Sequence, residues 1–256
     1  MKPLNLNDKL IKSLSLYFDG KGCFEGLGLK SLSKNYQWPK KGSFPLLNRI
    51  SMIKIEGKSN YEKNIGLKEN SQNIWRDGVK LDIANWAISD WGGIRGNRPK
   101  TIQSYVDAIN DGNHPNGISG VASYSKILSF MDPKKYAIYD ARVAISLNAI
   151  QMLCGEKSGL IFCYLPGRNT ALTRFRNLDA TKPKELVKIG WEKIPRKDCY
   201  LTYIRYMIGI KSLYQNVNLY ELEMALFADS ESLAGKLLGN SQAPHGMSCF
   251  GLLSRR

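Results

Sequence analysis

Apolar and polar residues follow a helical period over much of this chain. Apolar residues recur three and four positions apart in several stretches, 4–18, 79–88, 101–112, 124–131, 141–150, 198–211 and 218–226. This spacing brings apolar side chains onto one face of an α-helix, so each stretch predicts an amphipathic helix. Gly and Pro end some of these patterns, as in the run SDWGGIRGNRP after the second stretch. The sequence therefore predicts a mainly α-helical protein.

The region from residue 20 to residue 70 lacks the helical period. Its closely spaced glycines and the run WPKKGSFP are typical of loops, and the alternation in RISMIKIEGK favours short β-strands. We expect residues 1–100 to form a helical and loop region with a small strand-containing insert. Residues 101–256 are expected to form a helical domain. A single compact unit and two lobes of helices both fit this pattern.

The net charge of the chain indicates the kind of partner that it binds, which the helical pattern does not. The 256 residues include 37 Lys and Arg against 22 Asp and Glu, a net charge of +15. The excess is present in both halves, 19 to 11 over residues 1–128 and 18 to 11 over residues 129–256, so it is no basic tail. An evenly basic protein favours a polyanion, because each neutralised phosphate releases a counterion. We expect double-stranded DNA as the partner; the alternative is a protein that is merely basic.

The cysteine and histidine positions give no metal-ligand pattern. The five cysteines are scattered and form no CxxC pair: Cys23, Cys154, Cys163, Cys199 and Cys249. They fit reduced thiols in a cytoplasmic protein. His114 and His245 lie in segments with the composition of loops, with no second histidine or acidic residue at metal-ligand spacing. The N-terminal stretch carries charges inside any apolar run, so it predicts no signal peptide, and no apolar run reaches membrane-spanning length. We expect a monomer without cofactor or membrane contact.

A glycine-containing turn precedes the helical stretch at residues 124–131. It reads Ile118-Ser119-Gly120-Val121-Ala122-Ser123. Such a turn lets the backbone approach a phosphate, and the N–H groups that open the next helix supply donors. The candidate DNA-backbone contacts are Gly120, Val121, Ala122 and Ser123. The alternative is an ordinary turn before an ordinary helix.

The whole segment from residue 118 to residue 145 helps to decide between these two interpretations of the turn. A Gly-Val hairpin is followed by a helix that contains Lys126, a short loop, the apolar triplet of residues 137–139 and Asp140 at the start of the next helix. This order resembles the helix-hairpin-helix DNA glycosylases, nearest to prokaryotic members of their 8-oxoguanine branch. The text YAIYDARVA is typical of prokaryotic proteins of that fold. The likeness covers about 30 residues and elsewhere extends only to helical character.

The resemblance implies roles for two residues. Asp140 would remain ionised at a helix start and would stabilise an oxocarbenium-like sugar or orient the nucleophile. Lys126 would be a neutral amine that attacks the sugar and forms a Schiff base. The excised base must be flipped out of the duplex into a pocket. The aromatic residues proposed to stack on it are Tyr124, Trp91 and Trp86.

Other interpretations of these residues stay open. When the Gly-Val hairpin is aligned without a gap to that of the bifunctional glycosylases, Tyr124 and not Lys126 falls at the position of their lysine. The interval from Lys126 to Asp140 is also shorter than is usual in those enzymes. Asp140 fits an N-cap of the helix that follows it. Lys126 fits a lysine that reaches from the edge of the core to water. Base-excision chemistry with or without lyase activity is therefore compatible with the sequence.

A second glycine-rich segment, DWGGIRGNR at residues 90–98, has possible DNA contacts. Adjacent glycines permit close backbone approach, Arg95 and Arg98 can meet phosphates, and Trp91 can pack or wedge. The segment also fits a helix end followed by a loop. Arg142, within the helix that Asp140 opens, fits either a phosphate contact or a solvated side chain.

Two other functions compete with a glycosylase. Glu56 and Lys58 lie two residues apart in IKIEGK, and with Asp19 they could form the magnesium site of a metal-dependent nuclease. A DNA-binding protein of the same fold without catalysis is the other alternative. The sequence identifies neither the excised base nor whether the role is repair or defence against modified DNA.

Overall fold

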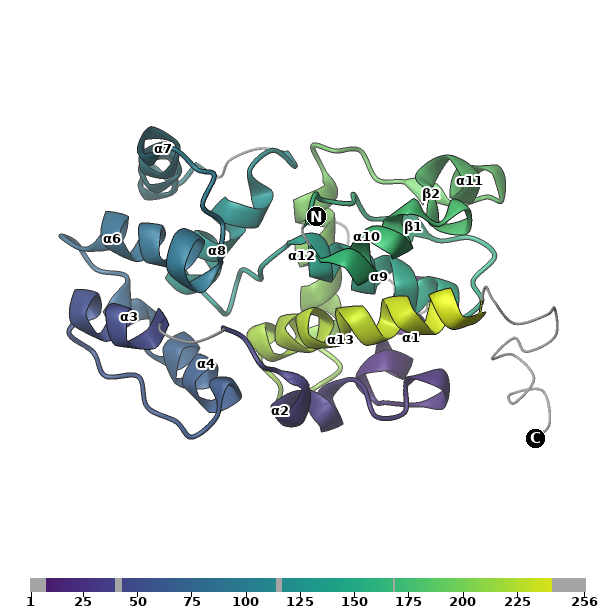
Figure 1. The fold of residues 1–256 in the computed structure, drawn as a ribbon, viewed down its shortest axis with the longest axis horizontal. Coiled ribbons are helices and arrows are strands. Elements are labelled where there is room, and N and C mark those ends of the chain that lie inside the picture. The colour runs from purple at the N-terminus through teal and green to yellow at the C-terminus, as the bar shows by residue number, and fades with distance from the viewer. Residues whose placement is uncertain (1–7, 40–42, 114–116, 168, 241–256) are drawn as a thin grey trace.

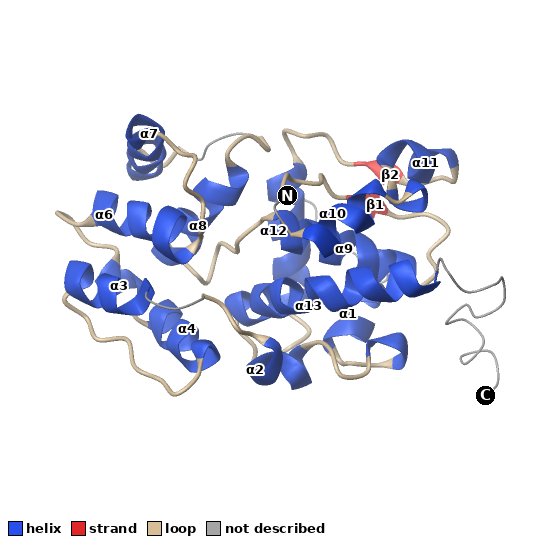
Figure 2. Ribbon diagram, in the orientation of Figure 1, coloured by secondary structure: helices blue, strands red, loops and turns tan. Residues whose placement is uncertain are grey.

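The described part of the chain is mainly α-helical, which confirms the predicted class. The computed structural model describes residues 8–39, 43–113, 117–167 and 169–240 (Figures 1 and 2). The α-helices are α1 (Lys9–Phe18), α2 (Leu32–Asn35), α3 (Ser43–Ser51), α4 (Asn60–Glu69), α5 (Ser71–Ile74), α6 (Lys80–Asn85), α7 (Pro99–Asn110), α8 (Val121–Met131), α9 (Ala141–Leu153), α10 (Thr170–Asn177), α11 (Pro183–Lys188), α12 (Cys199–Lys211) and α13 (Leu219–Asn240). The shorter turns are the 3-10 helices η1 (Gly22–Phe24), η2 (Leu29–Ser31) and η4 (Asp179–Thr181), and the π-helical segment η3 (Trp86–Trp91).

The helices form two groups that lie side by side (Figure 1). The central group consists of α3 to α8 with η3, and the terminal group of α1, α2 and α9 to α13. Within the terminal group α13 packs along α9, while α1 contacts both α9 and α12. The segment 132–140 leads from the central to the terminal group and ends at the start of α9. The sequence boundary expected near residue 100 thus falls within the central group.

The predicted strand-containing insert is wrong for the described residues of this region. RISMIKIEGK instead supplies the end of α3 and an irregular stretch over residues 53–58. The two strands found in the described residues are β1 (Leu160–Ile161) and β2 (Glu192–Lys193), which pair in parallel. The alternation misled because Ile50 packs against the apolar core from a helical turn, while Ile55 is buried from an irregular segment. Burial of every second residue does not require a sheet.

Helix α9 is the centre of the terminal group. Every residue from Val143 to Gln151 is buried, so this helix has no solvent-facing side over that stretch. Its polar side chains are satisfied: Asn148 bonds both the N–H and the carbonyl of Phe162, and Ser146 donates to the Leu226 carbonyl at 2.6 Å. Such a helix is held rigidly, and its N-terminal residue is therefore placed with little freedom.

One apolar core cluster includes residues of both groups, and a second cluster lies mainly in the central group. Tyr124 of α8 makes an edge-on ring contact with Tyr200 of α12, with ring centres 5.6 Å apart. The Tyr203 hydroxyl donates to the Ile138 carbonyl at 3.0 Å, which fixes the segment between the groups. Within the described residues, no helix has the length and apolar content that a bilayer crossing requires.

Candidate functional site: a pocket between the two helix groups

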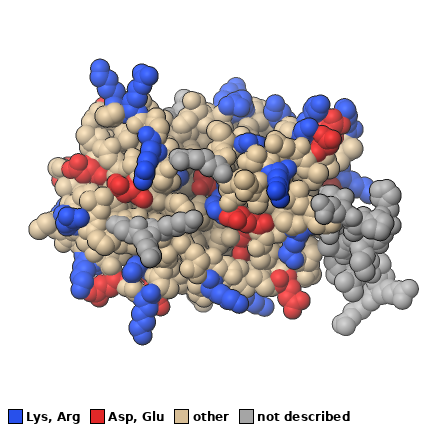
Figure 3. Space-filling view, viewed as in Figure 1, with Lys and Arg blue, Asp and Glu red and all other residues tan. Residues whose placement is uncertain are grey.

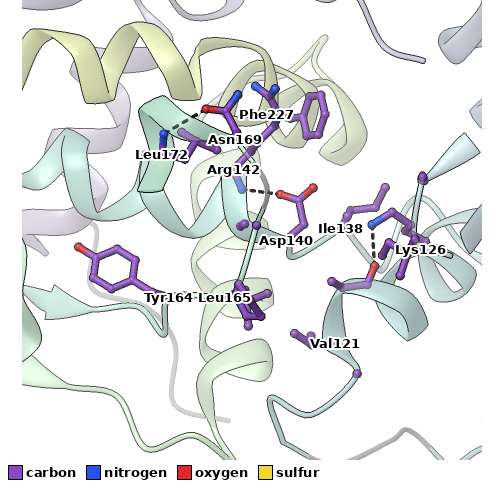
Figure 4. Close-up of a pocket in the computed structure, with 18 of the residues that line it drawn as sticks. Val121, Lys126, Ile138, Asp140, Arg142, Tyr164, Leu165, Asn169, Leu172 and Phe227 are labelled. Atoms are coloured by element: carbon purple, nitrogen blue, oxygen red, sulfur yellow. Dashed lines mark hydrogen bonds between the residues drawn. The ribbon is translucent and has the colours of Figure 1, made fainter. Parts of the chain in front are cut away.

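A pocket of about 900 Å³ lies where the two helix groups meet (Figure 4). Its lining comes from several parts of the chain: residues 91–96 at and after the end of η3, the hairpin and α8, residues 138 and 140–142, residues 164–167, 169 and 172, Arg196, and α13. Trp38, in the stretch that enters the central group, completes the wall. The pocket therefore depends on the packing of segments that are distant in the sequence.

The predicted hairpin forms one edge of this pocket. Gly120 has φ of 71°, a left-handed conformation that favours glycine, and it immediately precedes α8. A side chain at this position would also collide with the Tyr105 hydroxyl. The Tyr124 hydroxyl donates to the Gly117 carbonyl at 2.6 Å, and Asn97 donates to the Ser123 hydroxyl at 2.8 Å. The backbone of the turn is thus fixed by α7, α8 and the 91–97 segment together.

Asp140 is the N-cap of α9 and faces the pocket. Its Oδ1 accepts the backbone N–H groups of Arg142 at 2.9 Å and Val143 at 3.1 Å. This is the capping role allowed by the sequence, but it does not bury the carboxylate, which is partly exposed within the pocket lining (Figure 4). The positive end of the α9 dipole lies beside it. One side chain can therefore both begin the helix and present a negative charge to a ligand.

Lys126 enters the same pocket from α8. Only 3% of the residue is exposed, and its Nζ donates to the Ala122 carbonyl one turn earlier at 2.6 Å (Figure 4). Burial lowers the pKa of this amine, and the negative charges of Asp140 and Glu223 oppose that shift. Gly92 makes room for it, since a side chain there would come within 2.6 Å of the Lys126 Cε. A lysine at the surface would retain its proton far more firmly.

Glu223 of α13 is a third ionisable group in the pocket. It is 2% exposed, and burial raises its pKa to about 7 while the charge of Lys68 acts in the opposite direction. Lys68 of α4 is also buried and donates to the Ser129 hydroxyl at 2.6 Å; burial lowers its pKa to about 8. The backbone of Ile138 hydrogen-bonds the Glu223 carboxyl. The pocket therefore holds a carboxyl group that changes protonation close to neutral pH, and the buried Lys68 interacts with it from outside the pocket lining.

Aromatic rings form the wall beside these groups. Trp38 contacts Phe227 of α13 at 5.6 Å between ring centres and Trp91 at 6.4 Å, both nearly edge to face. Arg142 stacks over the Phe227 ring at 5.0 Å and forms an ion pair with Glu231 at 2.7 Å. A flat, partly apolar ligand would find ring faces and edges within reach of an amine and two carboxyl groups.

The structure brings most of the sequence-predicted site residues to this pocket. The pocket is lined by Asp140, Lys126, Gly120, Val121, Ala122, Arg142, Arg95 and Trp91. Ser123 follows the lining residue Ala122, and the exposed Arg98 lies two residues after Gly96; neither lines the pocket itself. Tyr124 and Trp86 are elsewhere: both are buried in the core, and the Trp86 indole donates to the Ser43 carbonyl at 2.7 Å. These two rings pack the fold.

Sequence reasoning missed three lining residues of clear chemical interest, Trp38, Glu223 and Phe227. Glu223 carried a signal, because it interrupts the apolar run of LYELEMALFA where a buried face was expected. Phe227 follows it by four residues and so shares its side of the helix. Trp38 lies in a segment with the composition of a loop, and nothing in the neighbouring sequence distinguishes it from a packing residue.

The residues considered for a nuclease site have local partners instead. Asp19 pairs with Lys21 at 2.7 Å and accepts from the Tyr214 hydroxyl, while the exposed Glu56 pairs with Lys54 at 2.8 Å. Lys58 ends the irregular stretch, and its backbone N–H donates to the Glu62 carboxylate at 2.5 Å. Among the residues that the structure describes, no three His, Cys, Asp or Glu side chains gather as a metal-binding group would require. His114 and His245 lie outside the described residues.

Comparison of this chain with protein-family models, with curated proteins and with solved structures gave no match.

Proposed function

We propose that this protein is a DNA glycosylase that excises a damaged or modified base after the base is flipped out of the duplex. The observation that carries the proposal is the meeting of Lys126 and Asp140 in one pocket. One belongs to α8 of the central group and the other opens α9 of the terminal group, so their meeting depends on the fold. Both residues also match the segment that resembles the helix-hairpin-helix glycosylases.

The chemistry of the pocket fits the two halves of such a reaction. As the bond between the sugar C1′ and the base breaks, the base leaves with the bonding electrons and positive charge develops on the sugar. The Asp140 carboxylate, fixed by two backbone N–H groups, is suited to stabilise that charge. In its neutral form Lys126 has a lone pair that can attack C1′, and burial favours this form. After loss of a proton and ring opening, the product would be a Schiff base.

Aromatic side chains would hold the flipped base. Trp38, Trp91 and Phe227 line the same pocket as Asp140, and base stacking on an aromatic side chain contributes about 1–3 kcal/mol per base. The volume of about 900 Å³ is ample for one nucleotide base with its sugar. The polar groups of the pocket, Glu223 above all, would then select among bases.

The surface and the hairpin supply a means of holding the duplex. Figure 3 shows Lys and Arg side chains spread over both helix groups with acidic side chains between them, as the net charge of +15 requires. At the pocket itself Arg95 and Arg196 are exposed lining residues, and the hairpin presents backbone N–H groups at the start of α8. Phosphates on either side of an extruded nucleotide would meet these groups.

Borohydride trapping tests the proposed chemistry. The intact protein is incubated with duplexes carrying oxidised, deaminated, alkylated and abasic sites, and sodium borohydride is added to reduce any Schiff base. We expect a covalent adduct on at least one duplex, with Lys126 as the modified residue on peptide mapping. Lys126→Met should abolish the adduct, whereas Lys68→Met should retain it, because Lys68 is a buried lysine outside the pocket lining.

The outcomes separate the competing functions. Base release without any adduct would assign the chemistry to a monofunctional glycosylase centred on Asp140. Cleavage of undamaged duplex that EDTA abolishes, together with loss on Glu56→Ala, would instead establish a nuclease. Salt-dependent binding with neither adduct nor base release on the whole panel would show a non-catalytic DNA-binding protein and overturn the proposal.

A further inference from the structure

Cys163 and Cys199 face each other behind the wall of the pocket. Cys163 lies two residues after the end of β1, and Cys199 is the first residue of α12. The Cys199 Sγ lies 3.3 Å from the backbone N of Cys163, and the two thiol side chains hydrogen-bond each other. The residues are 36 positions apart in sequence, so the contact is created by the fold. Both thiols are free in this structure.

The two thiols differ in their surroundings. Cys199 is fully buried, and its one thiol proton can be donated either to the Tyr139 hydroxyl at 3.3 Å or to the Cys163 sulfur, whereas Cys163 retains some exposure. The hydrogen bond from Cys199, helped by the charges of Arg196 and Lys193, lowers the pKa of Cys163. Those two cations are exposed and line a small pocket of about 150 Å³ that also contains Cys163. A small oxidant can therefore approach a partly ionised thiol that has a second thiol beside it.

We propose that Cys163 and Cys199 form an oxidation site at which a peroxide converts the two thiols into an intramolecular disulfide. The Cys163 thiolate attacks one peroxide oxygen, the O–O bond breaks, and hydroxide leaves, giving a sulfenic acid on Cys163. The Cys199 sulfur then attacks the Cys163 sulfur and the S–O bond breaks. The thiol proton and the departing hydroxyl form water. Overall two thiols are oxidised by two electrons and one peroxide is reduced to two waters.

The site is joined to the larger pocket through Tyr139. The Tyr139 hydroxyl donates to the Cys163 carbonyl at 2.8 Å and accepts the Cys199 thiol, and the next residue is Asp140. On the other side, Tyr164 and Leu165 directly follow Cys163 and line the larger pocket. A disulfide removes the thiol proton that Cys199 gives to Tyr139 and constrains the segment that carries this wall. Oxidation therefore changes the position of Asp140 through Tyr139, the residue that precedes it in the chain.

Peptide mapping of the intact protein tests the disulfide without any substitution. The reduced chain is treated with hydrogen peroxide, remaining thiols are alkylated, and the digest is analysed by mass spectrometry before and after dithiothreitol. We expect loss of two thiols and a single cross-linked species that joins the peptides of Cys163 and Cys199, released again by dithiothreitol. Cys23 and Cys154 should remain alkylatable. A disulfide joining other cysteines, or equal oxidation of every thiol, would overturn the proposal.

Two variants identify the attacking thiol. In Cys199→Ser the sulfenic acid on Cys163 has no partner, so a dimedone adduct should accumulate there, while Cys154→Ser should leave the cross-link unchanged. Thermal melting of both variants checks that they fold. In the wild-type protein, the rate of iodoacetamide labelling at Cys163 should rise with pH at a midpoint below about 8.5, the ordinary value for a cysteine thiol. Dimedone labelling at Cys23 or Cys154 in place of Cys163 would contradict the assignment.

The effect on the larger pocket is a separate measurement and rests on the proposed function. If the protein excises bases, the peroxide-treated form should release base several-fold more slowly than the reduced form, and dithiothreitol should restore the rate. Cys199→Ser should not show the restorable loss. Because the cross-link is mapped chemically, its presence stands or falls independently of any base release.

Discussion

Asp140 combines two functions that are usually assigned to different side chains. As an N-cap it satisfies two of the free N–H groups of α9, and as a partly exposed carboxylate it faces the pocket between the helix groups. Conservative substitution can separate these functions, because asparagine caps a helix about as well as aspartate and carries no charge.

For Asp140→Asn we expect a stability close to that of the wild-type protein, with base release reduced at least about a hundredfold, the usual effect of removing a preorganised electrostatic group. Asp140→Ala should in addition lose about 1 kcal/mol of unfolding free energy, because the cap is lost. Urea denaturation and single-turnover base release measure the two effects. Full activity in Asp140→Asn would show that the residue is only a cap.

Glu223 gives the protein a pH-dependent stability. Its pKa is raised from 4.5 to about 7 in the folded state, so the folded protein binds a proton that the unfolded chain has released over this interval. Its contribution is therefore greatest below about pH 4.5 and is lost as the pH rises through about 7. The pKa values of Lys68 and Lys126 are lowered by burial, and removing the Glu223 charge would lower them further.

Glu223→Gln should consequently match the wild-type protein at pH 4.5 and become the more stable of the two by about 1–3 kcal/mol at pH 8. Urea denaturation at a series of pH values measures the difference. Glu221→Gln is the matched control, since that carboxylate lies at the start of the same helix and is only partly buried. A stability difference that does not vary with pH would contradict the assigned protonation of Glu223.

At the scale of elements, periodicity predicted several of the longer helices but missed α3 and α4, of nine and ten residues, which lie in the region expected to form loops and strands. Predicted stretches such as 141–150 and 198–211 correspond to α9 and α12, where each turn contributes an apolar residue to the core. Helices such as α2 and α5 contain only four residues and are too short to show a period. The stretch 79–88 begins as α6 and continues as the π-helical η3 through Trp91, a change of hydrogen-bonding pattern that spacing of apolar residues cannot indicate.

The sequence also predicted only some of the residues of the candidate site. Residues adjoining the hairpin and the start of α9 were identified, because a glycine turn and an N-cap have local sequence signals. Trp38, Glu223 and Phe227 were not identified, because they reach the pocket through packing of distant segments. Trp86 and Tyr124 were expected to stack on a base, but ring size alone does not distinguish a packing residue from a binding residue; both are buried in the core.

The hairpin conformation itself can be tested with two glycines. Gly112 and Gly120 have nearly equal φ, 72° and 71°, but a side chain at Gly112 meets open space and one at Gly120 collides with Tyr105. Gly112→Ala should destabilise the fold by about 1 kcal/mol through its backbone conformation alone. Gly120→Ala should lose more unfolding free energy than Gly112→Ala, and the DNA affinity of the variant should fall as well. Urea denaturation and fluorescence anisotropy measure both; equal losses in the two variants would contradict the packing described for the hairpin.

At the scale of the whole molecule, the chain crosses between the helix groups at the places where the pocket is built. Trp38 lies on the way from the terminal to the central group, and residues 132–140 return to the terminal group (Figure 1). Under the proposed function, the flipped nucleotide would occupy the pocket between the two helix groups while their outer surfaces contact the flanking duplex. The basic charge is consistent with that arrangement, because it is shared by both groups (Figure 3).

DNA affinity should therefore fall steeply with salt, and individual arginines should contribute separately to the slope. Arg95→Ala and Arg98→Ala should each reduce the slope of log K against log salt by about 0.9, the value for one phosphate contact. Lys54→Ala is the control, because Lys54 already pairs with Glu56 away from the pocket. Anisotropy titrations at several salt concentrations measure the slopes. Unchanged slopes in both arginine variants would remove the 91–98 segment from the DNA interface.

The central claim is that this pocket excises a base from duplex DNA with Asp140 at its centre. The most direct measurement is release of free base, scored by mass spectrometry, from a panel of duplexes with oxidised, deaminated, alkylated and enzymatically modified bases, using the wild-type protein and Asp140→Asn side by side. We predict release of at least one base by the wild-type protein and its loss in the folded variant. Absence of release from every duplex, or equal release by the two proteins, would contradict the account.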